Sequence, residues 1–187
     1  MKPSISKNNP KQQIRNRIKS LLQLQNPFEN EQLQNQFNNH LKGYLKSQSG
    51  CWAGFRPMKS EPQWLSICEE LPNLTWAFPK IEGPSLKIYK NVKSFKKGPL
   101  QILEPADGDL VLVDQLQGCL FPGLAFSSKG TRLGHGAGYY DRGLENFQGT
   151  RVGLCFAIQF LETEIPSEAH DIEMNYVVTE NGFYKVA

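Results

Sequence analysis

The sequence of 187 residues lacks any apolar run close to the roughly 20 residues that a membrane-spanning helix needs. Its four cysteines are widely spaced and form no C-x-x-C pair, which argues against a zinc site or a thioredoxin-like motif. The polar N-terminal segment does not contain the apolar core of a signal peptide. We therefore expect a cytoplasmic protein that does not contact a membrane.

The composition is typical of a globular protein, with 39% hydrophobic and 11% aromatic residues. A chain of this length suits one domain and can bury a core without disulfide or metal cross-links. We find no internal repeat and no low-complexity tract. We therefore expect residues 1–187 to form a single domain, and we expect a monomer.

The net charge of +3 is unevenly distributed along the chain. Residues 1–60 contain ten Lys or Arg and two Glu, a net charge of +8, while the remainder has a net charge of −5. Such an excess is compatible with a nucleic-acid-binding arm, with a few cations directed at a small anionic ligand, or with a solvated surface. On charge alone, a solvated surface is the favoured explanation.

Hydrophobic periodicity and turn signals predict alternating helices and strands. Asn9 followed by Pro10 is a typical helix start. We expect helices over about 10–24, about 28–46 and from Ser60 to about Leu71. We expect strands at 51–55, 75–81, 85–90, 109–113, 152–158, 175–180 and 183–186, with 109–113 and 152–158 buried on both faces. This order predicts an α/β fold of three layers, α/β/α, with a largely parallel central sheet and a ligand site at the carboxyl ends of its strands.

The most informative segment is a glycine-rich stretch in which Gly134, Gly136 and Gly138 alternate with other residues. Alternating glycines allow close backbone approach and can direct N–H groups toward a phosphate. Arg132 lies just upstream, and a helix is expected to begin near Tyr139. The segment is neither a G-K-[ST] phosphate loop nor a dinucleotide fingerprint that directly follows a strand. Its neighbours favour a phosphate site over a flexible surface loop.

Several charged residues are further candidates. Lys11 and Arg15 border the apolar stripe of the first helix and oppose its dipole, which is compatible with a nearby anion. On this evidence alone, side chains that extend along a solvated helix are the favoured explanation. Glu61 can either stabilise a helix start or accept hydrogen bonds from a heterocycle. Asp141 and Asp171 are carboxylates of the kind that hold Mg²⁺ together with substrate phosphates.

The run from Pro122 to Arg142, PGLAFSSKGTRLGHGAGYYDR, resembles the signature of the 5-formyltetrahydrofolate cyclo-ligase (5,10-methenyltetrahydrofolate synthetase) family. Other family features occur in the same order: Lys11-x-x-x-Arg15, Gly54-Phe55 through Glu61, Ile102-Leu103-Glu104-Pro105 and Pro166-x-x-x-His170-Asp171. The resemblance covers nearly the whole chain. The glycine–Tyr-Tyr-Asp motif is its most specific part.

The resemblance implies an ATP- and Mg²⁺-dependent ligase that closes 5-formyltetrahydrofolate to 5,10-methenyltetrahydrofolate through a phosphorylated formyl intermediate, with ADP and phosphate released. It implies folate binding by Phe55, Glu61 and Tyr140, and metal binding by Asp141 and Asp171. It also implies ATP binding by Lys11, Arg15, Arg132, Leu133, Gly134, His135, Gly136, Ala137, Gly138, Tyr139 and Tyr140. The partners would be these small molecules, and neither nucleic acid nor membrane.

The sequence departs from the family pattern at several positions. Residues 114–121 read as an insertion at the mouth of the site, where they would reshape the folate pocket or form a lid. Ser127, Ala137 and Asn175 differ from the usual residues, and Gly54-Phe55-Arg56-Pro57 replaces a strand that usually ends in Ser. Two alternatives stay open. One is a different ATP-dependent enzyme on the same fold, such as a small-molecule kinase, which the insertion favours slightly. The other is a non-catalytic nucleic-acid-binding module that uses the basic first 60 residues.

Overall fold

The computed structural model describes residues 9–186, so Lys2 and Lys7 of the basic N-terminal segment lie outside the described residues. The main helices are α1 (Pro10–Gln25), α2 (Glu31–Leu45) and α3 (Tyr139–Gly143). Short 3-10 helices span η1 (Pro27–Glu29), η2 (Leu65–Glu70), η3 (Val113–Gln115) and η4 (Ala157–Gln159). None of the described helices is long and apolar enough to span a membrane.

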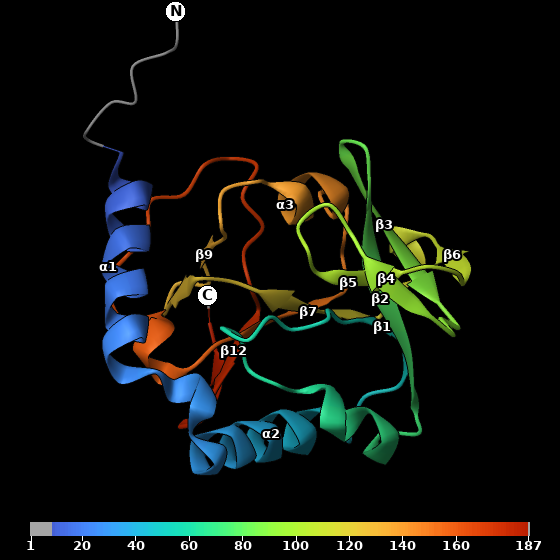
Figure 1. Ribbon diagram of the computed structural model, residues 1–187, viewed down its shortest axis with the longest axis horizontal. Coiled ribbons are helices and arrows are strands. Elements are labelled where there is room, and N and C mark those ends of the chain that lie inside the picture. The colour runs from blue at the N-terminus through green and yellow to red at the C-terminus, as the bar shows by residue number, and fades with distance from the viewer. Residues whose placement is uncertain (1–8, 187) are drawn as a thin grey trace, which may run out of the picture.

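An eight-stranded sheet forms the centre of the molecule (Figure 1). Its strands are, in spatial order, β13 (Gly182–Lys185), β12 (Tyr176–Thr179), β10 (Thr150–Leu154), β7 (Gly118–Pro122), β1 (Gly50–Ala53), β2 (Leu74–Glu82), β3 (Ser85–Lys90) and β6 (Asp109–Val111). The strands from β12 to β2 are parallel, and the pairs at both edges are antiparallel. The expected α/β fold with a largely parallel sheet is confirmed.

Two small sheets flank the large one. One contains β11 (Phe160–Leu161), β8 (Ala125–Ser127) and β9 (Arg132–Leu133), and the other is the hairpin of β4 (Phe95–Lys97) and β5 (Leu103–Pro105). Helix α1 packs its buried Ile18 and Leu22 against Leu124, Ala125 and Leu133, beside the first small sheet. In Figure 1, α1 and the β4–β5 hairpin lie on opposite sides of the molecule.

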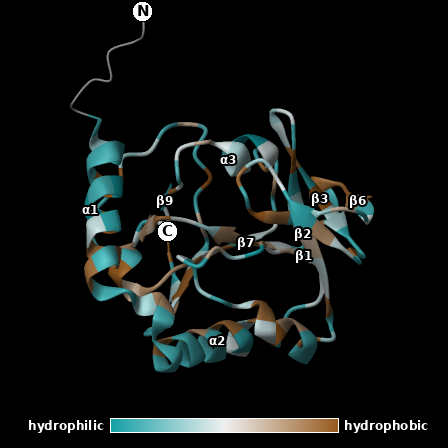
Figure 2. Ribbon diagram, in the orientation of Figure 1, coloured by the Kyte–Doolittle hydropathy of each residue, from teal (hydrophilic) through white to brown (hydrophobic). Residues whose placement is uncertain are grey.

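The two faces of the large sheet are covered unequally. On one face, Phe37, Leu41 and Leu45 of α2 pack against side chains of the central strands, including Leu120 and Val152. In Figure 2, hydrophilic residues cover most of α1 and α2, as expected for helices that bury a single stripe. The other face is covered by the five-residue helix α3, the residues after it and loops, so the second helical layer is thin.

The two predicted helix starts at the N-terminal end agree well with the structure. The Asn9 side chain accepts a hydrogen bond from the Gln12 N–H group, and Pro10 occupies the first turn of α1. Asn30 caps α2 in the same way, so this helix begins three residues later than predicted. The predicted strands at 75–81, 85–90, 175–180 and 183–186 are confirmed with small shifts of their ends.

Three predictions of secondary structure are wrong. The helix expected from Ser60 is the shorter 3-10 helix η2, because Met58 to Glu61 form a turn closed by the Glu61 carboxylate and backbone. The strand expected at 109–113 is not covered on both faces: β6 is an edge strand that pairs with β3, and Leu110 is 51% exposed. The strand at 152–158 ends at Leu154, where η4 follows shortly.

Residues 114–121, predicted as an insertion at the mouth of the site, do not form a separate loop over the cavity. Gly118–Pro122 form β7, which pairs with β1 on one side and β10 on the other. Cys119, Leu120 and Phe121 are completely buried, so this segment cannot act as a lid. β7 is itself an apolar strand that runs directly into the Pro122-Gly-Leu-Ala-Phe motif.

Candidate functional site

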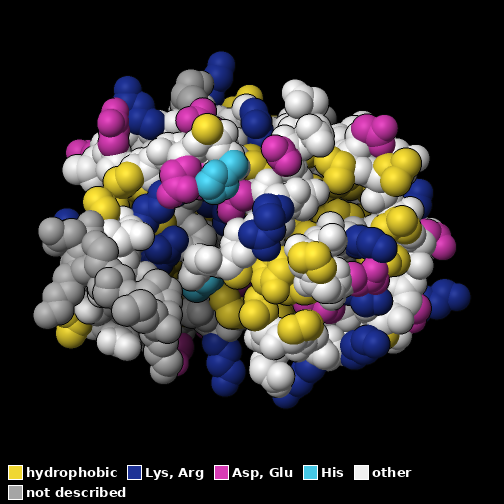
Figure 3. All heavy atoms as spheres, turned by 90° about the horizontal axis from the view of Figure 1, so that it is seen from above, with side chains coloured by type: hydrophobic (Ala, Val, Ile, Leu, Met, Phe, Trp, Pro, Cys, Tyr) yellow, Lys and Arg dark blue, Asp and Glu magenta, His cyan; other side chains and the backbone are white. Residues whose placement is uncertain are grey.

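A cavity of about 400 Å³ lies at the carboxyl ends of β1, β2 and β7, as expected for a parallel sheet. Viewed from above, Lys, Arg and His side chains border a hollow beside hydrophobic ones (Figure 3). The cavity gathers all fifteen residues that the sequence analysis proposed for ATP, folate or metal, although they come from four separate parts of the chain. These residues are Lys11, Arg15, Phe55, Glu61, Arg132, Leu133, Gly134, His135, Gly136, Ala137, Gly138, Tyr139, Tyr140, Asp141 and Asp171. Their individual roles stay predictions.

The glycine-rich loop connects β9 to α3 along the wall of this cavity. Gly136 has a φ of +107° and Gly138 a φ of +66°, a backbone region that favours glycine. Across residues 9–186, we find no hydrogen-bond acceptor for the N–H groups of residues 134–138. The Arg15 side chain donates from Nε to the Gly134 carbonyl at 3.0 Å and so positions α1 against the loop. A row of available N–H groups beside arginine suits an anionic ligand.

Arg132 forms the most buried ion pair of the cavity. Its Nη2 atom lies 2.6 Å from Asp141 Oδ1, and the two side chains are 5% and 15% exposed. Nη1 donates to the Pro122 carbonyl at 3.3 Å, while the buried Nε has no hydrogen-bond partner in the described part of the chain. An unsatisfied buried guanidinium N–H is costly, and a ligand oxygen would remove this cost.

Lys11 connects the start of α1 to the C-terminal segment across 160 positions of sequence. Its Nζ atom lies 2.7 Å from Asp171 Oδ2 and 3.0 Å from Glu168 Oε1. Burial opposes the charged form of Lys11, but the bonds to Asp171 and Glu168 outweigh it and raise the pKa of Lys11. Burial likewise opposes ionisation of Asp171, and the bonds from Lys11 and the Glu168 N–H group lower its pKa.

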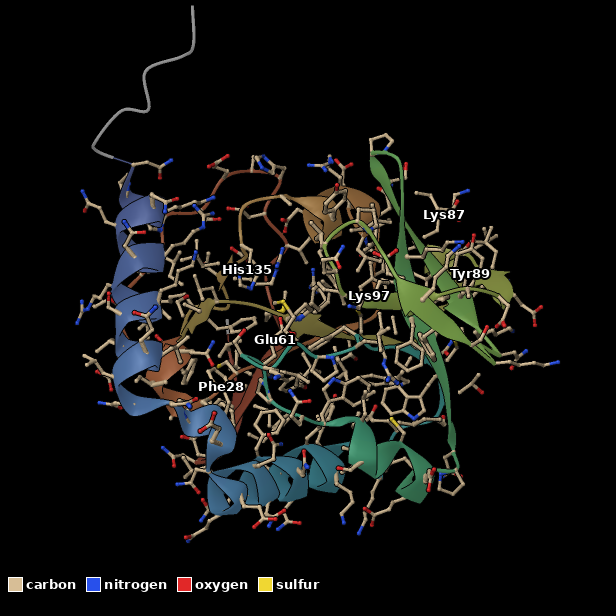
Figure 4. The ribbon with its side chains drawn as sticks, viewed as in Figure 1. Phe28, Glu61, Lys87, Tyr89, Lys97 and His135 are labelled. Atoms are coloured by element: carbon tan, nitrogen blue, oxygen red, sulfur yellow. The ribbon has the colours of Figure 1, made fainter. Side chains whose placement is uncertain are left out.

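Glu61 lies in the interior of the molecule, on the loop that follows β1 (Figure 4). The residue is 5% exposed, and its Oε2 atom accepts a hydrogen bond from the Met58 N–H group at 2.7 Å. Burial raises the pKa of Glu61 to about 7, although the Met58 N–H group opposes this shift. A buried carboxylate with one oxygen still available can bind the paired N–H groups of a heterocycle.

Two aromatic residues expected to contact folate have different surroundings. Phe55 is buried beside Trp64, with ring centroids 5.9 Å apart. The Tyr140 ring lies 5.7 Å from that of Phe121, and the Arg132 guanidinium carbon is 5.6 Å from its centroid. Burial raises the pKa of Tyr140 well above its usual value, so its hydroxyl stays protonated.

His135 also lines the cavity, as an exposed residue of the glycine loop (Figure 4). Partial desolvation of the imidazole lowers the pKa of His135, and the positive charges of Lys19, Arg132 and Arg15 lower it further. The neutral form of the imidazole is therefore favoured. His170, which the sequence left without a firm role, lies at the cavity edge with a side chain that is 65% exposed.

One whole wall of the cavity is formed by residues that were not predicted as site residues from the sequence. The β4–β5 hairpin contributes Leu100, Ile102, Leu103 and Glu104, and Arg56 lies beside it. Burial raises the pKa of Glu104, which is 6% exposed. The motif Ile102-Leu103-Glu104-Pro105 pointed to this segment, but nothing local to it indicated that the hairpin folds over the carboxyl end of β1.

A divalent cation would depend on Asp141 and Asp171. Within residues 9–186, no group of three or more His, Cys, Asp or Glu side chains is arranged to hold a metal ion. The Ile172 N–H group donates to Asp141 Oδ1 at 3.5 Å, so the Asp141 carboxylate approaches the backbone next to Asp171. Mg²⁺ typically takes one or two carboxylates and completes its coordination with water and substrate phosphates, and this donor set fits that requirement.

The fold and the cavity define a compact α/β protein whose pocket, lined by cations and a glycine loop, lies at the carboxyl ends of its parallel strands. The chain belongs to the 5-formyltetrahydrofolate cyclo-ligase family, whose sequence model matches residues 7–180. The 5-formyltetrahydrofolate cyclo-ligase of Saccharomyces cerevisiae is 39% identical over 106 residues, which cover 52% of this chain and 48% of that protein. The probable enzyme of Schizosaccharomyces pombe is 30% identical over 50% of this chain and 53% of its own length. The chain thus spans about half the length of these curated relatives.

Two solved structures resemble the fold along most of its length. The 5,10-methenyltetrahydrofolate synthetase of Aquifex aeolicus is 28% identical, with a TM-score of 0.80 over 95% of this chain and 93% of that one. The synthetase of Mycoplasma pneumoniae is 19% identical, with a TM-score of 0.72 over 91% of this chain and 98% of that one, which supports the fold alone.

Proposed function

We propose that this protein catalyses the ATP- and Mg²⁺-dependent cyclisation of 5-formyltetrahydrofolate to 5,10-methenyltetrahydrofolate, with release of ADP and phosphate. One observation carries the proposal: a single cavity combines a glycine loop, three cations and two carboxylates with Glu61 and the apolar side chains of the β4–β5 hairpin. Such a cavity suits a polyphosphate next to a heterocycle. Membership of the cyclo-ligase family supplies the reaction.

The proposed chemistry has two steps. The formyl oxygen attacks the γ-phosphorus of ATP, a P–O bond forms and ADP leaves. The N10 nitrogen then attacks the formyl carbon, the new C–N bond closes the ring, N10 loses its proton, and phosphate leaves with the former formyl oxygen. Phosphorylation is needed because an amide oxygen is a poor leaving group, so the protein acts mainly by positioning the two substrates and stabilising charge.

The side chains would have different roles in this reaction, according to their chemistry. Lys11, Arg15 and Arg132 would neutralise the phosphates together with the N–H groups of residues 134–138, and bound Mg²⁺ would add positive charge at the phosphates. Asp141 and Asp171 would hold that ion. Glu61 would accept hydrogen bonds from the N–H groups of the pterin, which fixes the ring in the cavity.

The structure weakens the support for both alternative functions, the kinase-like enzyme and the nucleic-acid-binding module. The kinase-like alternative drew support from an insertion at 114–121, but residues 118–121 belong to the central strand β7. The nucleic-acid alternative drew support from the basic first 60 residues, but Lys11, Arg15 and Arg56 line the cavity. A titration with RNA at several salt concentrations tests it, because phosphate contacts give a steep negative slope.

The direct test mixes the purified protein with ATP, Mg²⁺ and 5-formyltetrahydrofolate and follows methenyltetrahydrofolate by its near-ultraviolet absorbance. We expect product only when all three components are present, with one ADP formed for each ring closed. Absence of product together with absence of folate binding would overturn the proposal. Release of ADP with a different acceptor, but not with this folate, would favour the kinase-like alternative.

A further inference from the structure

Arg56 is a cavity residue to which neither the sequence motifs nor the proposed reaction gives a role. It follows Phe55 at the exit of β1 and lines the cavity together with Met58, Pro79 and Ile81. Its guanidinium carbon lies 4.6 Å from the centroid of the Phe95 ring on β4, so the side chain is held against the β4–β5 hairpin. Phe95 is in turn fixed edge-to-face on Phe78, at 5.3 Å.

The charge of Arg56 has no counterion in the described part of the protein. Lys11 and Arg132 each form an ion pair with a carboxylate, and Arg15 donates to the Gly134 carbonyl. By contrast, no carboxylate among residues 9–186 lies within ion-pairing distance of Arg56, and its guanidinium donates no hydrogen bond to these residues. A half-buried arginine held by a ring face, with its N–H groups available, is well prepared to bind an anion.

The surroundings of Arg56 differ from those of the phosphate-binding candidates. Leu100, Ile102 and Leu103, toward the turn of the hairpin, line the same cavity, and Leu100 and Leu103 are 50% and 39% exposed. The glycine loop and Lys11 belong to the other side of the cavity, where α1 packs. An apolar wall that ends in an unpaired cation suits a ligand with an aromatic body and a terminal carboxylate.

We propose that Arg56 binds a carboxylate of the glutamate moiety of the folate substrate and thereby makes the enzyme selective for glutamylated folates over pteroates. This inference rests on the proposed function, because it takes 5-formyltetrahydrofolate as the ligand. Glu61, on the same loop, binds the pterin end. The p-aminobenzoyl ring lies along the hairpin leucines, and Arg56 receives the anionic end of the molecule.

The test compares 5-formyltetrahydrofolate with 5-formyltetrahydropteroate, which lacks the glutamate. In Arg56→Gln we expect KM for the folate to rise about ten- to a hundredfold, the size of a lost charge-assisted hydrogen bond, while kcat stays within about twofold. KM for the pteroate stays unchanged. Arg56→Lys recovers part of the loss because it keeps the charge but not the planar donor pair.

The matched control is Arg17→Gln, which removes an exposed arginine of α1 that does not line the cavity. This variant leaves KM for both substrates unchanged. The proposal is wrong if Arg56→Gln loses the same factor on both substrates, because Arg56 would then only support the hairpin. It is also wrong if neither KM changes.

Calorimetric binding of the two compounds in the absence of ATP separates this inference from the proposed function. If the wild-type protein forms no product, the proposed reaction fails, yet a glutamate-dependent affinity that is lost in Arg56→Gln still supports the role of Arg56. If the wild-type protein binds the folate and the pteroate equally well, or binds neither, the role of Arg56 is refuted.

Discussion

Replacing Asp141 by Asn removes the negative charge opposite Arg132 and leaves almost everything else in place. The pair is short, at 2.6 Å, and the Arg132 side chain is 5% exposed. Arg132 Nε already lacks a partner within the described residues, so the guanidinium depends on Asp141 and the Pro122 carbonyl for its compensation. The variant therefore places an uncompensated cation in the cavity wall.

The geometry of the pair sets the expected loss of stability in Asp141→Asn. Removing one partner of a buried ion pair typically costs about 3–5 kcal/mol. Asp141 is 15% exposed, and the amide oxygen of Asn still accepts a hydrogen bond, so we expect the free energy of unfolding to fall by about 2–3 kcal/mol. For a chain of this size, that loss corresponds to a decrease in Tm of about 5–10 °C.

Asp171→Asn is the matched comparison. Lys11 retains Glu168 at 3.0 Å after the change, and the Glu168 side chain is 59% exposed, so the expected loss is about 1 kcal/mol or less. Denaturant and thermal unfolding at pH 7, without nucleotide or metal, measure both variants. Equal stability of Asp141→Asn and the wild-type protein would refute the reasoning, and so would a larger loss in Asp171→Asn. The double variant Arg132→Met, Asp141→Leu should recover most of the stability, because no buried charge then remains.

Three further outcomes are expected. Arg132→Ala and Asp141→Ala should both weaken use of MgATP while the proteins remain folded, and full activity in both would exclude this phosphate site. Gly136→Ala should weaken nucleotide binding and lower the free energy of unfolding by about 1–3 kcal/mol, because its φ of +107° strains any residue other than glycine. Gly43→Ala in α2, where an added Cβ atom meets nothing within 4 Å, should leave stability unchanged or raise it slightly. Burial raises the pKa of Glu61 to about 7, so folding favours its protonated form and the free energy of unfolding decreases as pH rises from about 4.5 to 7. The Tm of Glu61→Gln should therefore exceed that of the wild-type protein by more at pH 8 than at pH 5. An equal difference at both pH values would contradict the burial of Glu61.

Local signals in the sequence were sufficient for the elements that depend on neighbouring residues. Asn9 and Pro10 define the start of α1, and the turn at Glu180-Asn181 joins the two strands of the terminal hairpin. The glycine loop was found because its residues are contiguous. The candidate site could therefore be assembled largely from motifs, each of which occupies only a few consecutive positions.

Long-range pairing could not be predicted in the same way. Residues 109–113 and 119–121 are both short apolar runs, and nothing local distinguishes the edge strand from the central one. Residues 118–122 form the central strand because they fit between β1 and β10. At this place Gly118 lies so close to the Trp52 ring that a Cβ atom would collide with it. The contact between Arg56 and Phe95 joins residues 39 positions apart, so it could not be predicted from either segment.

The two ion pairs should also differ in how their loss affects stability, because of the way α1 is held against the rest of the protein. Ile18 and Leu22 bury the second half of this helix against Leu124 and Leu133, whereas Lys11 and Arg15 hold the first half through polar contacts with the loops. Loss of the Lys11–Asp171 pair should therefore loosen the first turns of α1 without unfolding the sheet, and its effect belongs to local opening. Loss of the Arg132–Asp141 pair acts where β9 and α3 meet the core, so the global free energy of unfolding decreases instead.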